Sequence, residues 1–331
     1  MTPTYAIKLA GADITDLWKP HLISLSVTDR TSDKKADSCS IVLQDSKAEL
    51  ELPESGVQLE IFLGYEGDDL PAVHRLQSVG KFIVDTISVS GPPNSLVIES
   101  KSAAFTNNDL NLANIQTKKS RTHEAQTIGS LVSKIAQENG LTAEVDSKLA
   151  VVNLGTVQQT DESDTHLLSR IAVGQGATYK VADNRMMFLT PGNSSNGEAE
   201  QFVISADSAT SWKFKIAKQP EYKSCIATYH DVGECGPVEV TAGSGKPVMR
   251  LRNPFKDEEE ATAAAKAFVD NARKEGVTFE VRMPGRSDLF AGARGVLSGF
   301  PYELVSKLEL TDIQHTLSRS GFSTEVAGKP L

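Results

Sequence analysis

Residues 57–65 read Val57-Gln58-Leu59-Glu60-Ile61-Phe62-Leu63-Gly64-Tyr65, with an apolar or aromatic side chain at every second position. This alternation is the pattern of a β-strand with one face on a core. Residues 23–28 alternate in the same way, and turn residues interrupt the pattern up to about Ser102. The expected strands are 5–9, 23–28, 39–43, 57–65, 82–89 and 96–100. About six strands in roughly a hundred residues predict a small β-barrel or sandwich over residues 1–102.

The apolar spacing then changes to the helical period. Apolar residues line one face of the stretch 128–136, and Asn139-Gly140 supplies a stop, which predicts a helix. A second helix is expected after the acidic stretch 161–164, because acids suit the first turn of a helix. Residues 179–181 and 186–189 read as a hairpin that closes a small α+β module over residues 103–192, and residues 192–197 look like a linker.

Strand-like alternation returns in the last third of the chain, with one helix among the strands. The expected strands are 201–205, 212–216, 225–230, 238–240, 277–283, 308–317 and 322–326. Asp257 and Glu260 have the spacing of a capping box, and an alanine-rich stripe follows up to Gly276. The fold class predicted from the sequence is therefore α+β and mostly β, with two small β-barrel-like domains at 1–102 and 193–331 around the α+β module.

Composition and charge exclude several classes of protein. The formal net charge is −9, and the densest basic stretch is the short 118–121, which argues against sequence-specific binding of nucleic acid. No apolar run approaches the ~20 residues of a membrane helix, so no membrane insertion is expected. Cys39, Cys225 and Cys235 form no CxxC pair, and a disulfide framework is not expected. These features fit a chain that is kept soluble in a cytoplasm.

Motifs that would indicate catalysis are incomplete. His123-Glu124 begins like a zinc-protease motif, but Thr127 stands where the second histidine is needed. The loop 243–247 resembles a phosphate loop only loosely and is expected to be a hairpin turn, and the six histidines lack ligand spacing. We therefore expect no metal, no cofactor and no enzyme activity. A pair of carboxylates for glycoside hydrolysis stays open, because such pairs are defined in space and not in sequence.

Two binding features have alternative interpretations. Trp18 and Trp212 are expected in the cores of the two β domains, although either could anchor a sugar or a protein partner. The polar loop 31–37 is expected to be a solvated hairpin tip or a charged finger that contacts a neighbouring ring of proteins. Its charged residues, the candidate ring-contact site, are Asp33, Lys34, Lys35 and Asp37.

Ordered segments along nearly the whole chain resemble the phage late control gene D protein family, which supplies baseplate hubs in contractile tails and in R-type pyocins. In the first part these segments are 23–29, 37–41, 57–65, 80–85 and 90–93. In the middle they are 127–129, 135–136, Gln158, 161–164 and 167–172. In the last part they are 283–285, 291–296, 313–315 and 321–324.

The resemblance implies a structural, non-enzymatic homotrimer in the baseplate of a virion or phage-tail-like particle. Each chain would contribute two β-barrel-like tube domains, so that the trimer joins the sixfold tail tube to the threefold central spike. The implied partners are the spike protein, the tail tube or tube-initiator protein and other baseplate proteins. The alternatives are a hub-associated peptidoglycan hydrolase and a carbohydrate-binding module that docks cell-wall glycan through residues 103–192.

Overall fold

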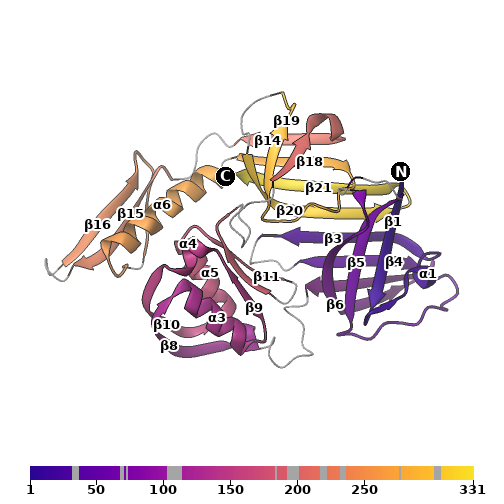
Figure 1. Ribbon diagram of the computed structural model, residues 1–331, viewed down its shortest axis with the longest axis horizontal. Helices are drawn as coiled ribbons and strands as arrows, with labels where there is room; N and C mark the ends of the chain where they lie inside the picture. Colours follow the sequence, from indigo (N-terminus) through magenta and orange to yellow (C-terminus); the bar gives the residue numbers. More distant parts are fainter. Residues whose placement is uncertain are drawn as a thin grey trace.

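The structure is a computed structural model and is mostly β (Figure 1). It describes residues 1–31, 37–67, 71, 74–102, 114–182, 185–191, 201–216, 222–231, 236–252, 254–275, 277–301 and 307–331. The chain folds into one large sheet, a middle module and a smaller sheet covered by a helix (Figure 1).

Thirteen strands form the large sheet, in the order β14-β18-β21-β20-β3-β4-β7-β6-β5-β1-β2, with β13 and β19 joined to it through β20. The first half of the chain supplies β1 Thr2–Leu9, β2 Ala12–Asp13, β3 Leu22–Arg30, β4 Ser38–Gln44, β5 Gln58–Glu66, β6 Gln77–Ser90 and β7 Ser95–Ser102, with the short helix α1 Thr15–Trp18. The last third supplies β13 Gln201–Ser205, β14 Ser211–Ile216, β18 Val277–Pro284, β19 Arg294–Ser298, β20 Lys307–Ser318 and β21 Gly321–Pro330, with the 3-10 turn η3 Ala206–Ser208.

The pairing of β3 with β20 joins the first and last parts of the chain. These strands run antiparallel, from Asp312 opposite Arg30 to Ser318 opposite Ser24. The mostly β prediction is confirmed, but the two expected barrels are not seen as closed bodies: among the described strands, the sheet path ends at β14 and β2 without closing. Alternation in the sequence shows which face of a strand is buried, but it does not show which strand lies beside it. The pairing of β3 with β20 therefore could not be predicted from the sequence.

The middle module has its own core. Its elements are β8 Lys118–Thr127, α3 Ile128–Glu138, β9 Thr142–Val145, α4 Ser147–Ala150, β10 Asn153–Ser163, α5 Asp164–Gly174, β11 Thr178–Ala182 and β12 Arg185–Leu189. Both predicted helices are confirmed. Thr127 and Ser163 cap α3 and α5 by accepting backbone N–H bonds. The predicted hairpin is β11–β12, and the parallel strand β9 beside β12 was not predicted.

A third unit, inside the region expected to be the second β domain, stands apart from the large sheet. It consists of β15 Ser224–Asp231, β16 Gly236–Gly243 and β17 Val248–Arg250, covered by α6 Glu258–Glu275 (Figure 1). Asp257 Oδ1 accepts the Glu260 N–H at 2.9 Å, so the predicted N-terminus of α6 is confirmed. The small residues Ala261 and Ala265 are fully buried with Cys225, which lets the helix lie close to the sheet.

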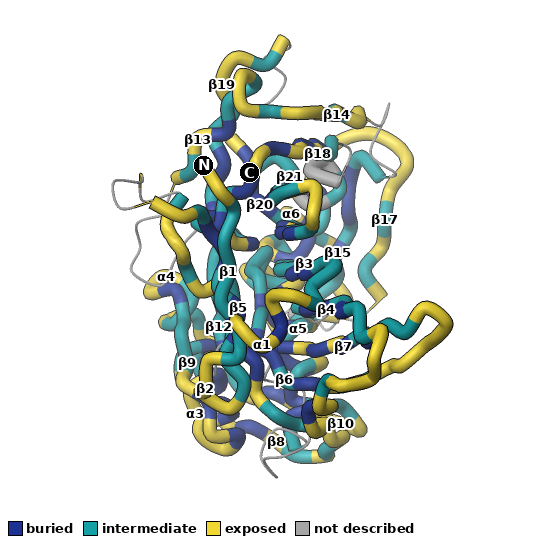
Figure 2. Tube along the Cα trace, turned by 90° about the vertical axis from the view of Figure 1, so that its right-hand side faces the viewer, coloured by how far each residue is buried: buried dark blue, intermediate teal, exposed yellow. Residues whose placement is uncertain are grey.

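The described residues contain four clusters of buried apolar side chains, and Figure 2 shows where the buried stretches lie along the chain. The apolar core of β1–β7 also takes in Leu317 and Phe322 of the C-terminal hairpin. Gly285 makes this contact possible, because a Cβ built on it would lie 2.0 Å from Cδ1 of Phe322. The hairpin β20–β21 therefore contributes side chains to two cores: the core of β1–β7 and the separate core of the C-terminal strands.

Candidate functional site

A cluster of three charged side chains lies where the middle module meets the large sheet. Lys180 of β11 forms ion pairs with Asp29 of β3 and with Asp37, which precedes β4. The distance from Lys180 Nζ to Asp37 Oδ2 is 3.0 Å. The three side chains are between 12% and 19% exposed, so the pairing takes place largely away from water.

Strand periodicity brings these residues together. Tyr179 and Val181 point into the core of the module, and Lys180 therefore points from the opposite face of β11 toward the sheet. Asp29 continues the face of β3 on which Val27 is buried. A lysine from one unit and an aspartate from the other thus meet at the boundary between the two.

Backbone groups complete the cluster, which we call the Lys180 junction (Asp29, Asp37 and Lys180). Asp29 Oδ2 accepts the Ala291 N–H at 2.8 Å, and Asp37 Oδ1 accepts the Arg30 N–H at 2.8 Å. Ala291 belongs to the loop between β18 and β19, so the junction links the first, middle and last parts of the chain.

Two carboxylates share one ammonium group in this junction. Burial raises the pKa of Asp37 to about 6; Lys180 acts to lower it, and the neighbouring Asp29 charge raises it further. Burial acts to lower the pKa of Lys180, but the charges of Asp29 and Asp37 outweigh it and hold that pKa above its usual value. Lys180 is therefore charged at any ordinary pH, while Asp37 is the group that titrates.

A hollow of about 650 Å³ adjoins the junction, between the module and the sheet. Its lining includes Gly80 of β6, Arg185 of β12, Ser287 of the loop between β18 and β19, and His315 of β20. Burial lowers the pKa of His315 to about 4, so this histidine is neutral near pH 7, and its Nδ1 lies 3.0 Å from Thr324 Oγ1. His315 is almost fully buried, at 2% exposed.

The candidate ring-contact residues fall into two groups. Asp33, Lys34 and Lys35 lie outside the described residues, and their contact with a neighbouring ring stays a prediction. Asp37 is described, and its carboxylate turns inward to Lys180 instead of standing on a solvated tip. Lys180 itself was missed, because one lysine on an alternating strand looks like any solvent-facing residue.

The incomplete catalytic motifs have structural explanations. His123 is fully buried, and its Nε2 lies 3.2 Å from Gln159 Oε1. Thr127, at the place of the missing zinc ligand, caps α3. Among the described residues, no group of three or more His, Cys, Asp or Glu is placed to hold a metal ion.

Other sequence expectations are refined in the same way. The loop 243–247 leads from β16 to β17, which lie on opposite sides of β15, so it is a crossover and not the expected hairpin turn. Cys39 and Cys225 are buried free thiols on strands, as expected, and Cys235 lies outside the described residues.

The basic stretch 118–121 lies on β8 and is largely used inside the module. Lys119 and Arg121 form ion pairs with the fully buried Asp164, at 2.5 and 2.9 Å. Lys118 pairs with the exposed Asp161 at 2.9 Å. Each of these cations is therefore paired with an acidic residue of the module.

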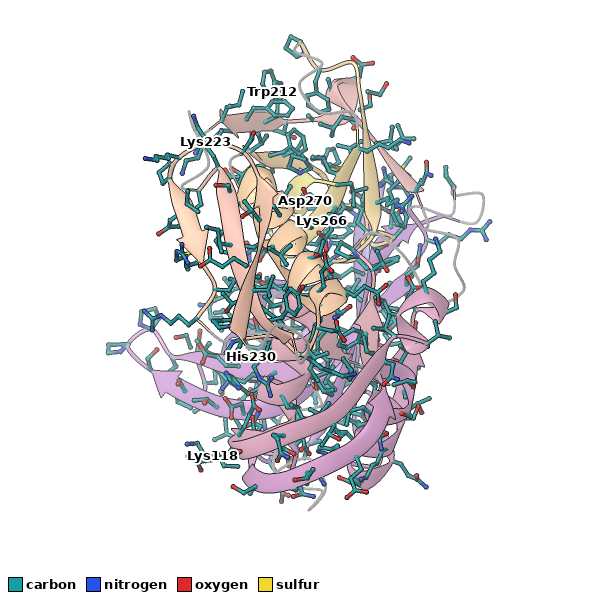
Figure 3. All side chains as sticks on the ribbon, turned by 90° about the vertical axis from the view of Figure 1, so that its left-hand side faces the viewer. Lys118, Trp212, Lys223, His230, Lys266 and Asp270 are labelled. Carbon is teal, nitrogen blue, oxygen red and sulfur yellow. The ribbon has the colours of Figure 1, made fainter. Side chains whose placement is uncertain are left out.

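One exposed aromatic side chain marks the edge of the large sheet. Trp18 is buried, as expected, but Trp212 is 39% exposed, so its predicted place in a core was wrong. It lies on β14, an end strand of the sheet path, and its ring packs against Phe214 and Phe300 at centroid distances of 5.7 and 5.8 Å. In Figure 3, Trp212 and Lys118 lie at opposite ends of the view. A sequence cannot distinguish an edge strand from a central one when both alternate.

The search for membrane-spanning helices was negative: within the described residues, no helix is long and apolar enough to cross a bilayer.

Comparison with solved structures shows what class of protein has this fold. The 43 kDa tail protein of prophage MuSo2 from Shewanella oneidensis superposes with a TM-score of 0.74, covering 99% of this chain and 98% of its own, at 11% identity. A tail protein from Neisseria meningitidis MC58 gives a TM-score of 0.71 at 13% identity, covering 99% and 97% of the two chains. The fold is therefore that of phage tail proteins.

Comparison of sequences identifies the family. Residues 110–321 match the family described as phage tail baseplate hub (GPD). The probable baseplate hub protein of Escherichia phage 186 is 28% identical over 370 aligned positions, covering 98% of this chain and 92% of the relative. This chain belongs to the phage tail baseplate hub family, which confirms the resemblance drawn from the sequence. It is a structural component of the baseplate of a phage virion.

Proposed function

We propose that this baseplate hub is a homotrimer that joins the sixfold tail tube of a contractile tail to its threefold central spike. A sixfold ring and a threefold ring fit together only through a layer with six similar contacts on one side and three on the other. Three chains with two β regions each would supply such a layer. The partners would be the spike protein, the tube or tube-initiator protein and other baseplate proteins.

The observation that carries this proposal is the continuous sheet through β3 and β20. It makes the first and last β regions of one chain a single body, so that a subunit could present two neighbouring contacts at a fixed spacing. We further propose that each region acts as a barrel-like tube domain once its open sheet ends are covered in the ring, since exposed edges otherwise invite unwanted pairing.

The edge strand β14 is a proposed contact within this ring. Trp212 and Ile216 are both exposed there, at 39% and 55%, and lie on the same face of the strand as Phe214. Rigid aromatic side chains at the centre of an interface often contribute most of its binding energy. The loop holding Asp33, Lys34 and Lys35 is a second proposed contact, with the neighbouring ring.

We propose that the hub acts without catalysis and without reading a nucleic-acid sequence. The net charge of −9 supports the second part, because phosphates are repelled where cations do not neutralise them. Zymography with the purified chain on peptidoglycan checks the first part. Clear lysis that disappears on substitution of one acidic residue would replace this proposal with a hydrolase function.

A matched pair of variants tests the proposed contact at β14. Trp212→Glu places a charge at the exposed aromatic site, and Val89→Glu places the same charge at a 65% exposed valine of β6. Analytical ultracentrifugation is expected to show trimers for the wild type and Val89→Glu and a shift toward monomers for Trp212→Glu. Trimers of unchanged stability for Trp212→Glu would remove β14 from the interface.

A further inference from the structure

The middle module is joined to the rest of the chain in an unusual way. Each of the four buried apolar clusters of the described residues belongs to a single unit, and the cluster of the module runs from Ile115 to Phe188 without a residue from outside. The module therefore has the core of a separate body, and its boundary with the sheet is not an apolar one.

The boundary consists instead of the Lys180 junction and the hollow of about 650 Å³ beside it. The other ion pairs recorded for described residues of the module, such as Lys119 with Asp164 and Arg185 with Glu144, stay inside it. Lys180 instead forms ion pairs out of the module, to Asp29 and Asp37.

Contact with α6 is close but also lacks a shared core. Gly176 follows α5, and a Cβ built on it would lie 3.6 Å from the Cβ of Ala267 on α6. A Cβ built on Gly155 would lie 3.3 Å from Nζ of Lys256, the end of a flexible side chain. The two units are therefore in contact here, but no buried apolar cluster of the described residues includes residues from both of them.

From this arrangement we propose that Lys180 is a releasable clamp: the middle module is a preformed body that Lys180 holds on the sheet, and it can leave the sheet as a unit while both keep their folds. A charge pair suits such a role. Its directional hydrogen bonds fix the position of the module on the sheet. Its net contribution to the stability of the attachment is small, because both charged partners lose hydration when they are buried. An apolar core of the same area would make the attachment permanent. The proposal does not depend on the trimer, because the clamp lies within one chain.

Hydrogen exchange of the full-length chain, followed by mass spectrometry, tests the clamp. Lys180→Met keeps the length of the side chain and removes its charge. Lys118→Met is the matched control, because Lys118 also lies in the module but pairs with the exposed Asp161 inside it. The wild type, Lys180→Met and Lys118→Met are compared at a single concentration at which all three have the same oligomeric state by mass.

The structure names the peptides that should respond. Those containing the amides of Arg30 and Ala291, which bond to Asp37 and Asp29, are expected to exchange on the order of 10- to 100-fold faster in Lys180→Met. The peptide of α3, residues 128–138, reports on the core of the module and is expected to exchange at the wild-type rate. Lys118→Met is expected to match the wild type in all of these peptides.

A charge exchange distinguishes pairing from simple loss of a side chain. Lys180→Asp combined with Asp37→Lys keeps one ammonium beside two carboxylates. It is expected to recover most of the protection that Lys180→Asp alone loses at Ala291, whose N–H still bonds to Asp29, but not at Arg30, because a lysine cannot accept the Arg30 N–H. Two results would overturn the proposal. One is unchanged exchange at Arg30 and Ala291 in Lys180→Met. The other is faster exchange of α3 in the same variant, which would make Lys180 part of the fold of the module.

Discussion

The pKa of Asp37 leads to a prediction whose sign is unusual for a carboxylate in an ion pair. Asp37→Asn removes the charge that can titrate and keeps the shape of the side chain. The amide oxygen of the introduced side chain can still accept the Arg30 N–H, which in the wild type bonds to Asp37 Oδ1 at 2.8 Å. Lys180 keeps its pair with Asp29. The variant therefore measures how much free energy it costs to bury the negative charge of Asp37 beside that of Asp29, with little change in packing.

The magnitude follows from the difference in pKa between the folded and unfolded states. The folded value is about 6, and an unfolded aspartate titrates near 3.9. Because the folded protein binds this proton more tightly, the contribution of Asp37 to the free energy of unfolding is fully present below about pH 4 and is lost as the pH rises through about 6. The loss amounts to about 3 kcal/mol.

Asparagine has no such loss. Asp37→Asn is therefore expected to be close to the wild type only below about pH 4, more stable by about 1.5 kcal/mol at pH 5, where half of the loss has occurred, and more stable by up to about 3 kcal/mol at pH 8. For a chain of this length that corresponds to a rise of about 4 °C in Tm. Comparing the two proteins at the same pH cancels the titration of all other groups.

Differential scanning calorimetry at pH 5 and pH 8 measures both values, with Asp161→Asn as the control for removing the charge of an exposed aspartate. The reasoning is refuted if Asp37→Asn is less stable than the wild type at pH 8 and the gap is wider there than at pH 5. That outcome would mean that the attraction of Lys180 exceeds the cost of burial.

Two further predictions concern residues inside the units. Asp164→Asn leaves the cations of β8 beside a neutral, fully buried amide and should lower the free energy of unfolding of the middle module by about 3–5 kcal/mol. In Asp161→Asn the change should stay below about 1 kcal/mol, and equal effects in a urea titration would contradict this account. Gly285→Ala drives a methyl group into the ring of Phe322 and should cost about 1–3 kcal/mol. At Gly174 an added Cβ would meet nothing within 4 Å, so Gly174→Ala should stabilise α5 by about 0.5–1 kcal/mol. A destabilised Gly174→Ala variant, or a Gly285→Ala variant as stable as the wild type, would contradict the packing described at these two glycines.

Local features of this fold could be predicted from the sequence because their causes are local. The helix α3 follows from the apolar stripe 128–136 and the stop at Asn139-Gly140, and the start of α6 follows from Asp257. The segment 283–285, which supported the family resemblance, contains the one residue type that fits against Phe322. For the two helices a cap or a period acts within a few residues, whereas the contact between Gly285 and Phe322 joins distant positions.

Features that depend on the pairing of distant segments could not be predicted. Ser24 lies opposite Ser318 in the sheet, and nothing in either alternating strand selects the other. The same limitation explains the exposed Trp212, whose strand is an edge only because of the strand order. It also explains the junction, since Lys180 and Asp29 are 151 positions apart. The charged loop was located from its composition, but composition did not show that Asp37 turns inward.

The central claim is that three copies of this chain form one hub on the spike. Native mass spectrometry of the chain co-expressed with the spike protein of the same tail measures this directly. Three chains of 35.6 kDa amount to about 107 kDa, and the account predicts a complex with this mass plus three spike chains, with no other ratio of hub to spike. A hub that stays monomeric at high micromolar concentration, or that binds the spike trimer as a single copy, would contradict it.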